Sequence, residues 1–266
     1  MNFLTIIFTA ASILTLSSKL LIADDAKLLF EKTIATEQGK ELITSLIAGG
    51  ITVSTWSQNE VNVKVYGNDE AEEKVIFSAD ATESGVKIEG KQKESKSMKN
   101  LSIRVEIVVP KNYNIKLYSA GGSFKIEGVE GKVEANSSGG SISIDNTKGN
   151  LEAYTAGGNI SIESSNGDIK VSTSGGKISI VGFTGNIDAS TAGGDINLVG
   201  QNGKIEASTA GGNVRLDYTG RNLGVDMSTL GGNITASLPG DFDANAEIGT
   251  LAGKITCDFA KVESEN

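Results

Sequence analysis

The sequence predicts an all-β protein whose main part is a parallel β-solenoid, a coil of short strands stacked in register. Three observations lead to this prediction. A repeat of 18 residues runs through the second half of the chain. Each repeat contains two short segments in which apolar and polar residues alternate, as in half-buried strands. That half of the chain shows no apolar period of about 3.6 residues, which an amphipathic helix would have.

Pairs of glycines mark the repeat. At five successive intervals of 18 residues, the pairs begin at Gly121, Gly139, Gly157, Gly175, Gly193 and Gly211. A further pair begins at Gly231, 20 residues on, and the degenerate pair Ala252-Gly253 follows after 21 more. The extra residues fall in the turns 217–224 and 237–245, where they leave the strands in phase. The repeat therefore predicts about eight rungs over residues 113–260.

Equivalent positions of the repeats hold similar side chains, which predicts the columns of a stacked core. Three residues after the first position of each pair come Phe124, Ile142, Ile160, Ile178, Ile196, Val214, Ile234 and Ile255. A pair of strands cannot bury its apolar face alone, whereas stacked copies bury a continuous core. Crossover handedness favours a right-handed coil, so we expect a single-stranded right-handed β-helix with 18-residue rungs. Cys257 takes the place of an inward Ile or Leu, which predicts a buried thiol.

The glycine pairs predict tight turns between stacked strands, where positive φ angles and close backbone approach favour glycine. A phosphate-binding glycine loop is followed by a helix, and here a strand pattern follows. A calcium β-roll is excluded because Ile196 and Leu198 stand where it needs a glycine and an aspartate. Two residues before each pair lies a hydroxyl, as in Thr155 and Thr191. We expect these side chains to form stacked hydroxyl hydrogen bonds.

The first 23 residues predict a signal peptide. Residues 3–16 form an apolar core of 14 residues, which suits a signal peptide and is short for a membrane span of about 20 residues. We place cleavage near Ala23. An uncleaved anchor over residues 3–22 is the alternative. Either reading predicts export, to the periplasm, the cell surface or the extracellular space.

Residues 24–112 lack the strict repeat but keep strand alternation, which predicts an irregular β cap continuous with the solenoid. Strand patterns occupy residues 42–46, 51–53, 61–65, 86–88 and 103–107. Residues 48–51 (AGGI) resemble a decayed rung, and residues 69–75 predict a helical turn. The open end of a solenoid exposes strand edges and invites end-to-end self-association. We expect the acidic tail, residues 261–266, to protect the end opposite the cap.

Composition excludes several classes of function. The chain has 266 residues, 24 Lys and Arg against 33 Asp and Glu, a net charge of −9, no histidine and one cysteine. Histidine-based catalysis, histidine metal sites, cysteine zinc clusters and an internal disulfide are therefore excluded. The acidic balance disfavours nucleic acid. After the signal peptide no segment is apolar enough to span a membrane, and no pattern predicts a cofactor or a metal.

One outward column predicts a binding site for a glycan. Tyr118, Asn136 and Tyr154 lie three residues before successive glycine pairs, so stacking would place two tyrosines on either side of an amide. Aromatic rings offer an apolar face and a polar tip, which suits stacking on sugar rings. The alternative is an ordinary strand surface, on which tyrosine is common.

A second outward column predicts a strip of negative charge. Asp188, Glu206, Asp226 and Glu247 lie five residues before successive pairs, so they would stack one rung apart. Like charges at that spacing repel, and a weakly bound cation would relieve the repulsion. The alternative is a solvated acidic face that opposes aggregation. Stacked carboxylates could also meet the spacing of a glycosidase pair, but nothing in the sequence indicates a cleft around them.

The repeat and its preceding segment resemble a known family. The segment 107–115 (IVVPKNYNI) and repeats such as 191–198 (TAGGDINL) and 203–207 (GKIEA) are similar to a bacterial family of putative adhesins of unknown function. The resemblance implies periplasmic or cell-surface β-solenoids and supplies no catalytic residues. We therefore expect an exported, non-catalytic adhesin or structural surface module of a bacterial envelope. The alternatives are a polysaccharide-binding or polysaccharide-active β-helix, or a scaffold for an envelope protein.

Overall fold

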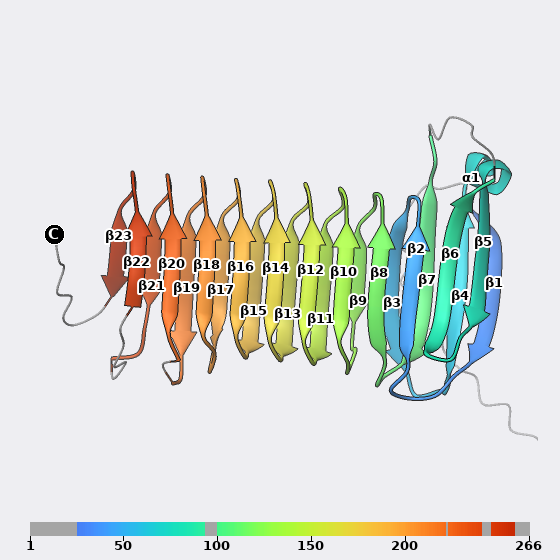
Figure 1. The fold of residues 1–266 in the computed structure, drawn as a ribbon, viewed down its shortest axis with the longest axis horizontal. Helices are drawn as coiled ribbons and strands as arrows, with labels where there is room; N and C mark the ends of the chain where they lie inside the picture. The colour runs from blue at the N-terminus through green and yellow to red at the C-terminus, as the bar shows by residue number, and fades with distance from the viewer. Residues whose placement is uncertain (1–25, 94–99, 222, 241–245, 259–266) are drawn as a thin grey trace, which may run out of the picture.

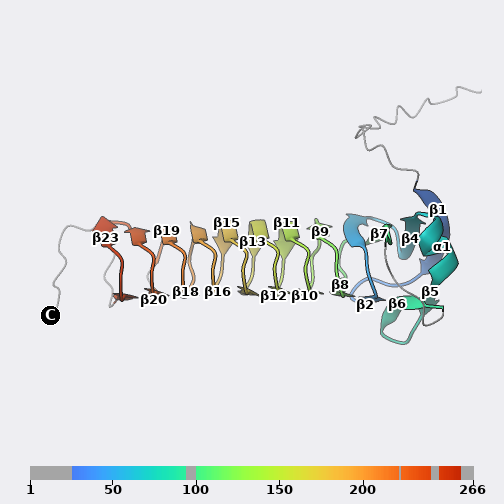
Figure 2. The same ribbon diagram turned by 90° about the horizontal axis from the view of Figure 1, so that it is seen from above.

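The structure, a computed structural model, describes residues 26–93, 100–221, 223–240 and 246–258. The expected signal peptide and acidic tail lie outside these residues. The described chain is almost entirely β and forms two long sheets that face each other (Figures 1 and 2). The prediction of a parallel β-solenoid is confirmed.

The regular part of the solenoid consists of eight strand pairs, one strand of each pair in each sheet, and its coil makes about seven turns from first pair to last. The pairs are β8 (Asn114–Ser119) and β9 (Phe124–Glu127), β10 (Val133–Ser137) and β11 (Ile142–Lys148), β12 (Leu151–Thr155) and β13 (Ile160–Asn166), β14 (Ile169–Thr173) and β15 (Ile178–Thr184), β16 (Ile187–Thr191) and β17 (Ile196–Gln201), β18 (Ile205–Thr209) and β19 (Val214–Thr219), β20 (Val225–Thr229) and β21 (Ile234–Ser237), and β22 (Ala246–Thr250) and β23 (Ile255–Asp258). Within these eight pairs, the even-numbered strands lie in one sheet and the odd-numbered strands in the other. The handedness of the coil stays a prediction.

Strands of neighbouring rungs pair in parallel with a constant shift of one repeat, so equivalent residues stack directly. Ile142 pairs with Ile160, and Ile160 pairs with Ile178. The longer turns leave this register unchanged, because Val214 still pairs with Ile234. Inward columns remain buried in the described rungs before the last one, as Ile162 shows with 0% exposure. The core is therefore a continuous stack of aliphatic side chains between the two sheets.

The N-terminal segment continues the stack before it caps it. Two more parallel rungs precede β8 and β9 in space: β2 (Glu41–Leu46) with β3 (Gly50–Trp56), and then β6 (Gly85–Gln92) with β7 (Ile103–Pro110). Residues 48–51, which resemble a decayed rung, cover the end of the turn after β2 and the first two residues of β3. Antiparallel strands then end each sheet, β1 (Lys27–Ala35) beside β4 (Glu60–Gly67) and β5 (Val75–Ala81) beside β6.

The helix α1 (Asp69–Lys74) lies where the sequence predicts a helical turn, and Asn68 caps it by accepting a hydrogen bond from Ala71 N at 3.1 Å. Strands β1 and β5 are absent from the sequence prediction. Both are edge strands with mixed burial, Leu28 being 50% exposed and Ile76 57% exposed. An edge strand buries too little of either face to impose a clear alternation of apolar and polar residues.

The hydroxyl column bonds to the glycine pairs rather than to itself, which corrects the expected hydroxyl-to-hydroxyl ladder. Thr191 Oγ1 donates to the carbonyl oxygen of Gly176 in the preceding rung at 2.9 Å and accepts from Gly194 N at 3.3 Å. Thr155, Thr173, Thr209 and Thr229 repeat the donated bond, at 2.8–3.0 Å. These hydroxyls are nearly buried, so each bond satisfies polar groups that water does not reach. The column therefore ties one rung to the next.

The second glycine of each pair is required by close backbone approach. A Cβ atom on Gly176 would lie 1.9 Å from the carbonyl oxygen of Gly158, whereas one on Gly175 would have no heavy atom within 4 Å. The degenerate pair fits this difference, because Ala252 replaces a first glycine and Gly253 keeps the second. Positive φ, which we also expected, occurs at Gly122 among the paired glycines and not at Gly176. The constraint is thus contact between rungs rather than backbone conformation.

The end of the solenoid opposite the cap is exposed in the part of the chain that the structure describes. Ile255 belongs to an inward column, and its stacking partner Ile234 has 0% exposure. Ile255 itself is 42% exposed, because no described strand stacks beyond β23. Self-association through this end stays a prediction, and the side chain of Cys257 lies outside the description.

The two glycines of one pair should differ sharply in their tolerance of a methyl group. Gly176→Ala should lower the free energy of unfolding by at least about 1 kcal/mol, because the rungs must separate to remove the overlap between the new Cβ atom and the carbonyl oxygen of Gly158. Gly175→Ala is the matched control and should stay within about 0.5 kcal/mol of the parent. Thermal melts followed by circular dichroism test both variants. Equal melting temperatures for the two variants would contradict the proposed contact.

Removing one hydroxyl should also destabilise the stack. Thr191→Val keeps the shape of the side chain but leaves the carbonyl of Gly176 and the amide of Gly194 without that partner. The expected loss is about 1–3 kcal/mol in denaturant unfolding. Ser190→Ala, one residue away on the outward face, should have little effect by comparison. A valine variant as stable as the alanine control would show that the hydroxyl column is not a structural bond.

Candidate functional site

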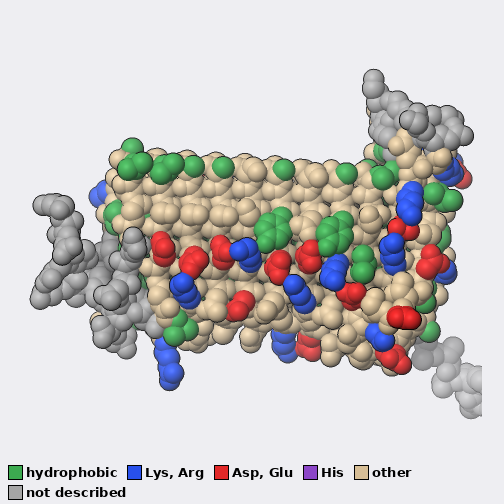
Figure 3. All heavy atoms as spheres, in the orientation of Figure 1, with side chains coloured by type: hydrophobic (Ala, Val, Ile, Leu, Met, Phe, Trp, Pro, Cys, Tyr) green, Lys and Arg blue, Asp and Glu red, His purple; other side chains and the backbone are tan. Residues whose placement is uncertain are grey.

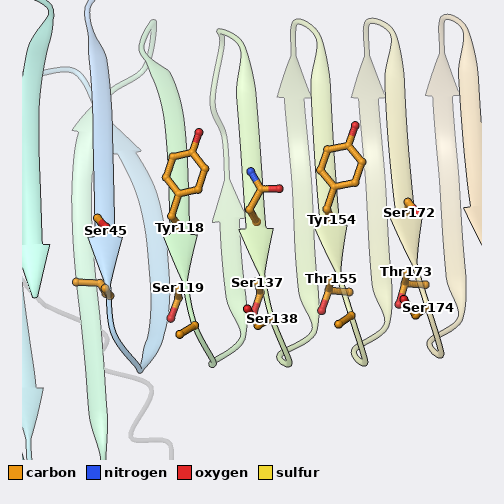
Figure 4. A pocket seen from close by; sticks show the side chains of 14 residues that line it. Ser45, Tyr118, Ser119, Ser137, Ser138, Tyr154, Thr155, Ser172, Thr173 and Ser174 are labelled. Carbon is orange, nitrogen blue, oxygen red and sulfur yellow. The ribbon is translucent and has the colours of Figure 1, made fainter.

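The outward face of the even-numbered sheet carries the predicted tyrosine site. Asn136 on β10 pairs in register with Tyr118 on β8 and with Tyr154 on β12. Both rings project to the same side of the sheet from strands two rungs apart (Figure 4). At about 4.8 Å for each rung, the two ring positions are separated by about 10 Å. The stacking of the repeats thus brings together the three residues that the sequence predicts.

A shallow open groove of about 550 Å³ lies beside the tyrosine rings. Its wall and floor come from β2, β8, β10, β12 and β14 and from the turns that follow them. Hydroxyl side chains line most of it. Ser45, Ser138, Ser172 and Ser174 are accessible, whereas Ser119, Ser137, Thr155 and Thr173 are nearly buried beneath the surface. A groove with aromatic rings on one side and small hydroxyls on the other suits a flat ligand that carries many hydroxyl groups.

Glu134 joins the site and was not among the predicted residues. Its Oε1 atom accepts a hydrogen bond from the hydroxyl of Tyr118 at 2.6 Å and another from Nδ2 of Asn136 at 3.2 Å. The bond from Tyr118 crosses between β8 and β10, and the bond from Asn136 lies within β10. Together they hold both side chains. Glu134 belongs to a neighbouring outward column, and only the register between strands shows that its carboxylate reaches the ring of the preceding rung.

The electrostatics of the site keep both phenols protonated. The hydrogen bond to the Glu134 carboxylate raises the pKa of Tyr118 to about 12, and burial adds to that effect. Burial raises the pKa of Tyr154, and the negative charge of Glu152 acts in the same direction. At neutral pH both side chains are therefore uncharged hydrogen-bond donors with an apolar ring face.

The predicted acidic column is in register, but lysines neutralise part of it. Asp188 pairs with Glu206, Glu206 with Asp226, and Asp226 with Glu247, along successive strands. Lys170 Nζ lies 2.7 Å from Asp188 Oδ2, and Lys204 binds Glu206. Figure 3 shows a band of acidic and Lys or Arg side chains that runs along this face of the molecule. Cation binding by these four acids stays a prediction, with two of them already held by ammonium groups.

The described residues show neither a metal cluster nor a membrane helix. Among them, no three acidic or thiol side chains converge closely enough to hold a metal ion. None of the described helices has the length and apolar character to cross a bilayer. The hydroxyls before the glycine pairs bond to backbone groups, as described above, and the buried hydroxyl of Thr147 donates to that of Ser165. The bonds of these described hydroxyls are therefore not to a base that could activate a nucleophile.

Fold and site together define a capped, two-sheet parallel β-solenoid that displays a groove on one face. The chain belongs to the family described as Toastrack DUF4097, whose match covers residues 47–265. This membership agrees in part with the resemblance noted in the sequence. No curated protein matches the chain significantly.

Solved structures similar to this chain include proteins from Parabacteroides distasonis and Bacteroides fragilis. A protein from Parabacteroides distasonis named as a putative lipid binding protein is 16% identical, with a TM-score of 0.51 over 85% of this chain and 96% of that one. A putative adhesin from Bacteroides fragilis is 17% identical, with a TM-score of 0.46 over 86% and 96% of the two chains. Another putative adhesin from Parabacteroides distasonis is 15% identical, with a TM-score of 0.46 over 87% and 97%. The likeness to the first of these supports the fold, and none of the three names describes a catalytic activity.

The bond between Tyr118 and Glu134 should be visible in an alkaline titration. Because the folded-state pKa of Tyr118 is raised from about 10 to about 12, its stabilising contribution is complete below pH 10 and is lost as the pH rises through 12. The absorbance of tyrosinate, compared between the parent and Tyr118→Phe, isolates this one phenol among five tyrosines. Glu134→Gln should move its titration to lower pH. An unchanged titration curve in that variant would contradict the assigned cause.

Proposed function

We propose that the chain is an exported, non-catalytic binding module of a bacterial envelope, an adhesin or surface module that holds a glycan in the tyrosine groove. The observation that carries the proposal is the pair of tyrosine rings two rungs apart, with Asn136 between them and hydroxyls along the adjoining groove. Export rests on the apolar N-terminal segment of the sequence.

The geometry favours an extended sugar chain over a small enclosed ligand. The groove is open along the solenoid axis and bordered by a repeating surface, so nothing encloses a compact molecule as a cavity would. Rings about 10 Å apart suit contact with alternate units of a chain that lies across the strands. Asn136 offers amide donor and acceptor groups between them, and sugar hydroxyls need both.

The family and the named relatives are compatible with binding rather than catalysis. Two of the similar structures are named as putative adhesins, and the third is named as a putative lipid binding protein. A polysaccharide-cleaving activity would need a general acid and a second carboxylate in one cleft. Here Asp188 and Glu206 lie on an outward face and are paired with lysines. Binding without turnover is therefore the function that we propose.

The double variant Tyr118→Ala/Tyr154→Ala tests this function. Purified protein is titrated with soluble oligosaccharides and sedimented with insoluble envelope polymers. Loss of two aromatic contacts, at about 1 kcal/mol each, should weaken glycan binding at least tenfold without changing the melting profile. Tyr66→Ala, which removes a tyrosine from β4 in the cap, is the matched control.

Saturable binding that survives the double substitution would refute the tyrosine site. Recovery of a defined envelope protein, with no binding to any glycan, would instead support a scaffold for a protein partner. Product release from a bound polysaccharide would refute the non-catalytic assignment.

A further inference from the structure

The carboxylate of Glu134 is negatively charged, and the groups that hydrogen-bond to it are neutral. Its two hydrogen-bond donors are the phenol of Tyr118 and the amide of Asn136, which carry no charge. Among the described residues Glu134 makes no ion pair. Its position is set by β10, the strand between the two strands that carry the tyrosines. The carboxylate is therefore oriented by the site itself.

The neighbouring carboxylates are each bound by a lysine. Glu41 lies 2.9 Å from Lys116, and Glu152 lies 2.8 Å from Lys132. Lys132 is close enough for the charge of Glu134 to act on it, but its ammonium is engaged by Glu152. Of the charges around the tyrosines, that of Glu134 is thus the one without a bonded cation, and it gives this part of the face an excess negative charge.

The aromatic rings add to the attraction for a positive group. Ring faces of tyrosine attract cations within about 6 Å of the ring centre. A ligand group over β10 would lie about 5 Å from the strand of either tyrosine, because one rung separates it from each. A cation at this position would meet the carboxylate from one side and an aromatic ring on either side.

We propose that this site selects glycans that carry protonated amines, such as polymers of de-acetylated amino sugars, with Glu134 as the residue that binds the ammonium group. The inference rests on the proposed glycan-binding function and names the ligand class for the same groove. Uronic acid polymers are disfavoured for the same reason, since their carboxylates would meet Glu134. The net charge of −9 repels anionic chains over the whole surface.

The test compares three sets of oligosaccharides of equal length: glucosamine oligomers, N-acetylglucosamine oligomers and galacturonate oligomers. Binding is measured by calorimetry at about pH 6, where aliphatic amines are protonated and carboxylates are ionised. The parent protein should bind the amine-bearing oligomers about tenfold more tightly than the acetylated ones, the scale of one charge-assisted hydrogen bond. It should not bind the galacturonates measurably.

Glu134→Gln is the decisive variant, because glutamine keeps an acceptor oxygen for Tyr118 and removes the charge. The preference for the amine-bearing oligomers over the acetylated ones should fall from about tenfold to within about twofold. Glu163→Gln removes the same charge from β13 in the opposite sheet and is the matched control. It should retain the full preference.

The outcomes separate this inference from the function on which it rests. Equal affinity of the parent for both oligomers, or a preference unchanged in Glu134→Gln, would overturn the amine selectivity and leave glycan binding intact. A preference lost equally in Glu163→Gln would assign the effect to net charge and would also overturn the role of Glu134. Absence of binding to every oligomer and polymer would refute the proposed function itself.

Discussion

Close contact between the glycine turns of successive rungs is the constraint on which this fold depends. The second glycine of each pair lies against the carbonyl oxygen of its counterpart one rung earlier, at a separation that leaves no space for a Cβ atom. The adjacent threonine hydroxyl bonds to that same carbonyl and so closes the contact. The glycine and the hydroxyl together hold successive rungs in contact. The glycine allows the approach, and the hydroxyl satisfies the backbone groups that the approach buries.

This contact sets the register of both sheets and therefore the surface that the protein displays. Because each rung repeats the position of the one before, a residue type repeated in the sequence becomes a straight column in space. Side chains in the outward columns do not pack in the core, so their residue types can differ between rungs. Tyr118, Asn136 and Tyr154 occupy one column, and that column changes to serine at Ser172. The proposed binding surface is thus a local change of residue types within otherwise uniform repeats.

The fold could be predicted from the sequence because a fixed repeat of apolar residues is what stacked, in-register strands require. The apolar columns that the repeat predicts are buried in the described rungs before the last one. A further inward column was not predicted, because its residue type changes from rung to rung: Val129, Thr147, Ser165 and Phe183. The antiparallel strands β1 and β5 could not be predicted, because edge strands carry no repeat and little alternation. The partner of the hydroxyl column was also predicted incorrectly. The sequence shows that hydroxyls are aligned, but only the rung geometry places glycine carbonyls nearer to them than the next hydroxyl.

The same limit explains why Glu134 was found only in the structure. Tyr118 and Glu134 are 16 residues apart, two short of the repeat, so they stand in different columns and on different rungs. A search along columns aligns residues at multiples of the repeat and cannot detect a diagonal contact between side chains. Diagonal contacts of this kind distinguish one place on a regular surface, because they join a charged side chain of one column to an aromatic side chain of the next column. In a solenoid, chemistry specific to one place arises where neighbouring columns change together, as they do between β8 and β12.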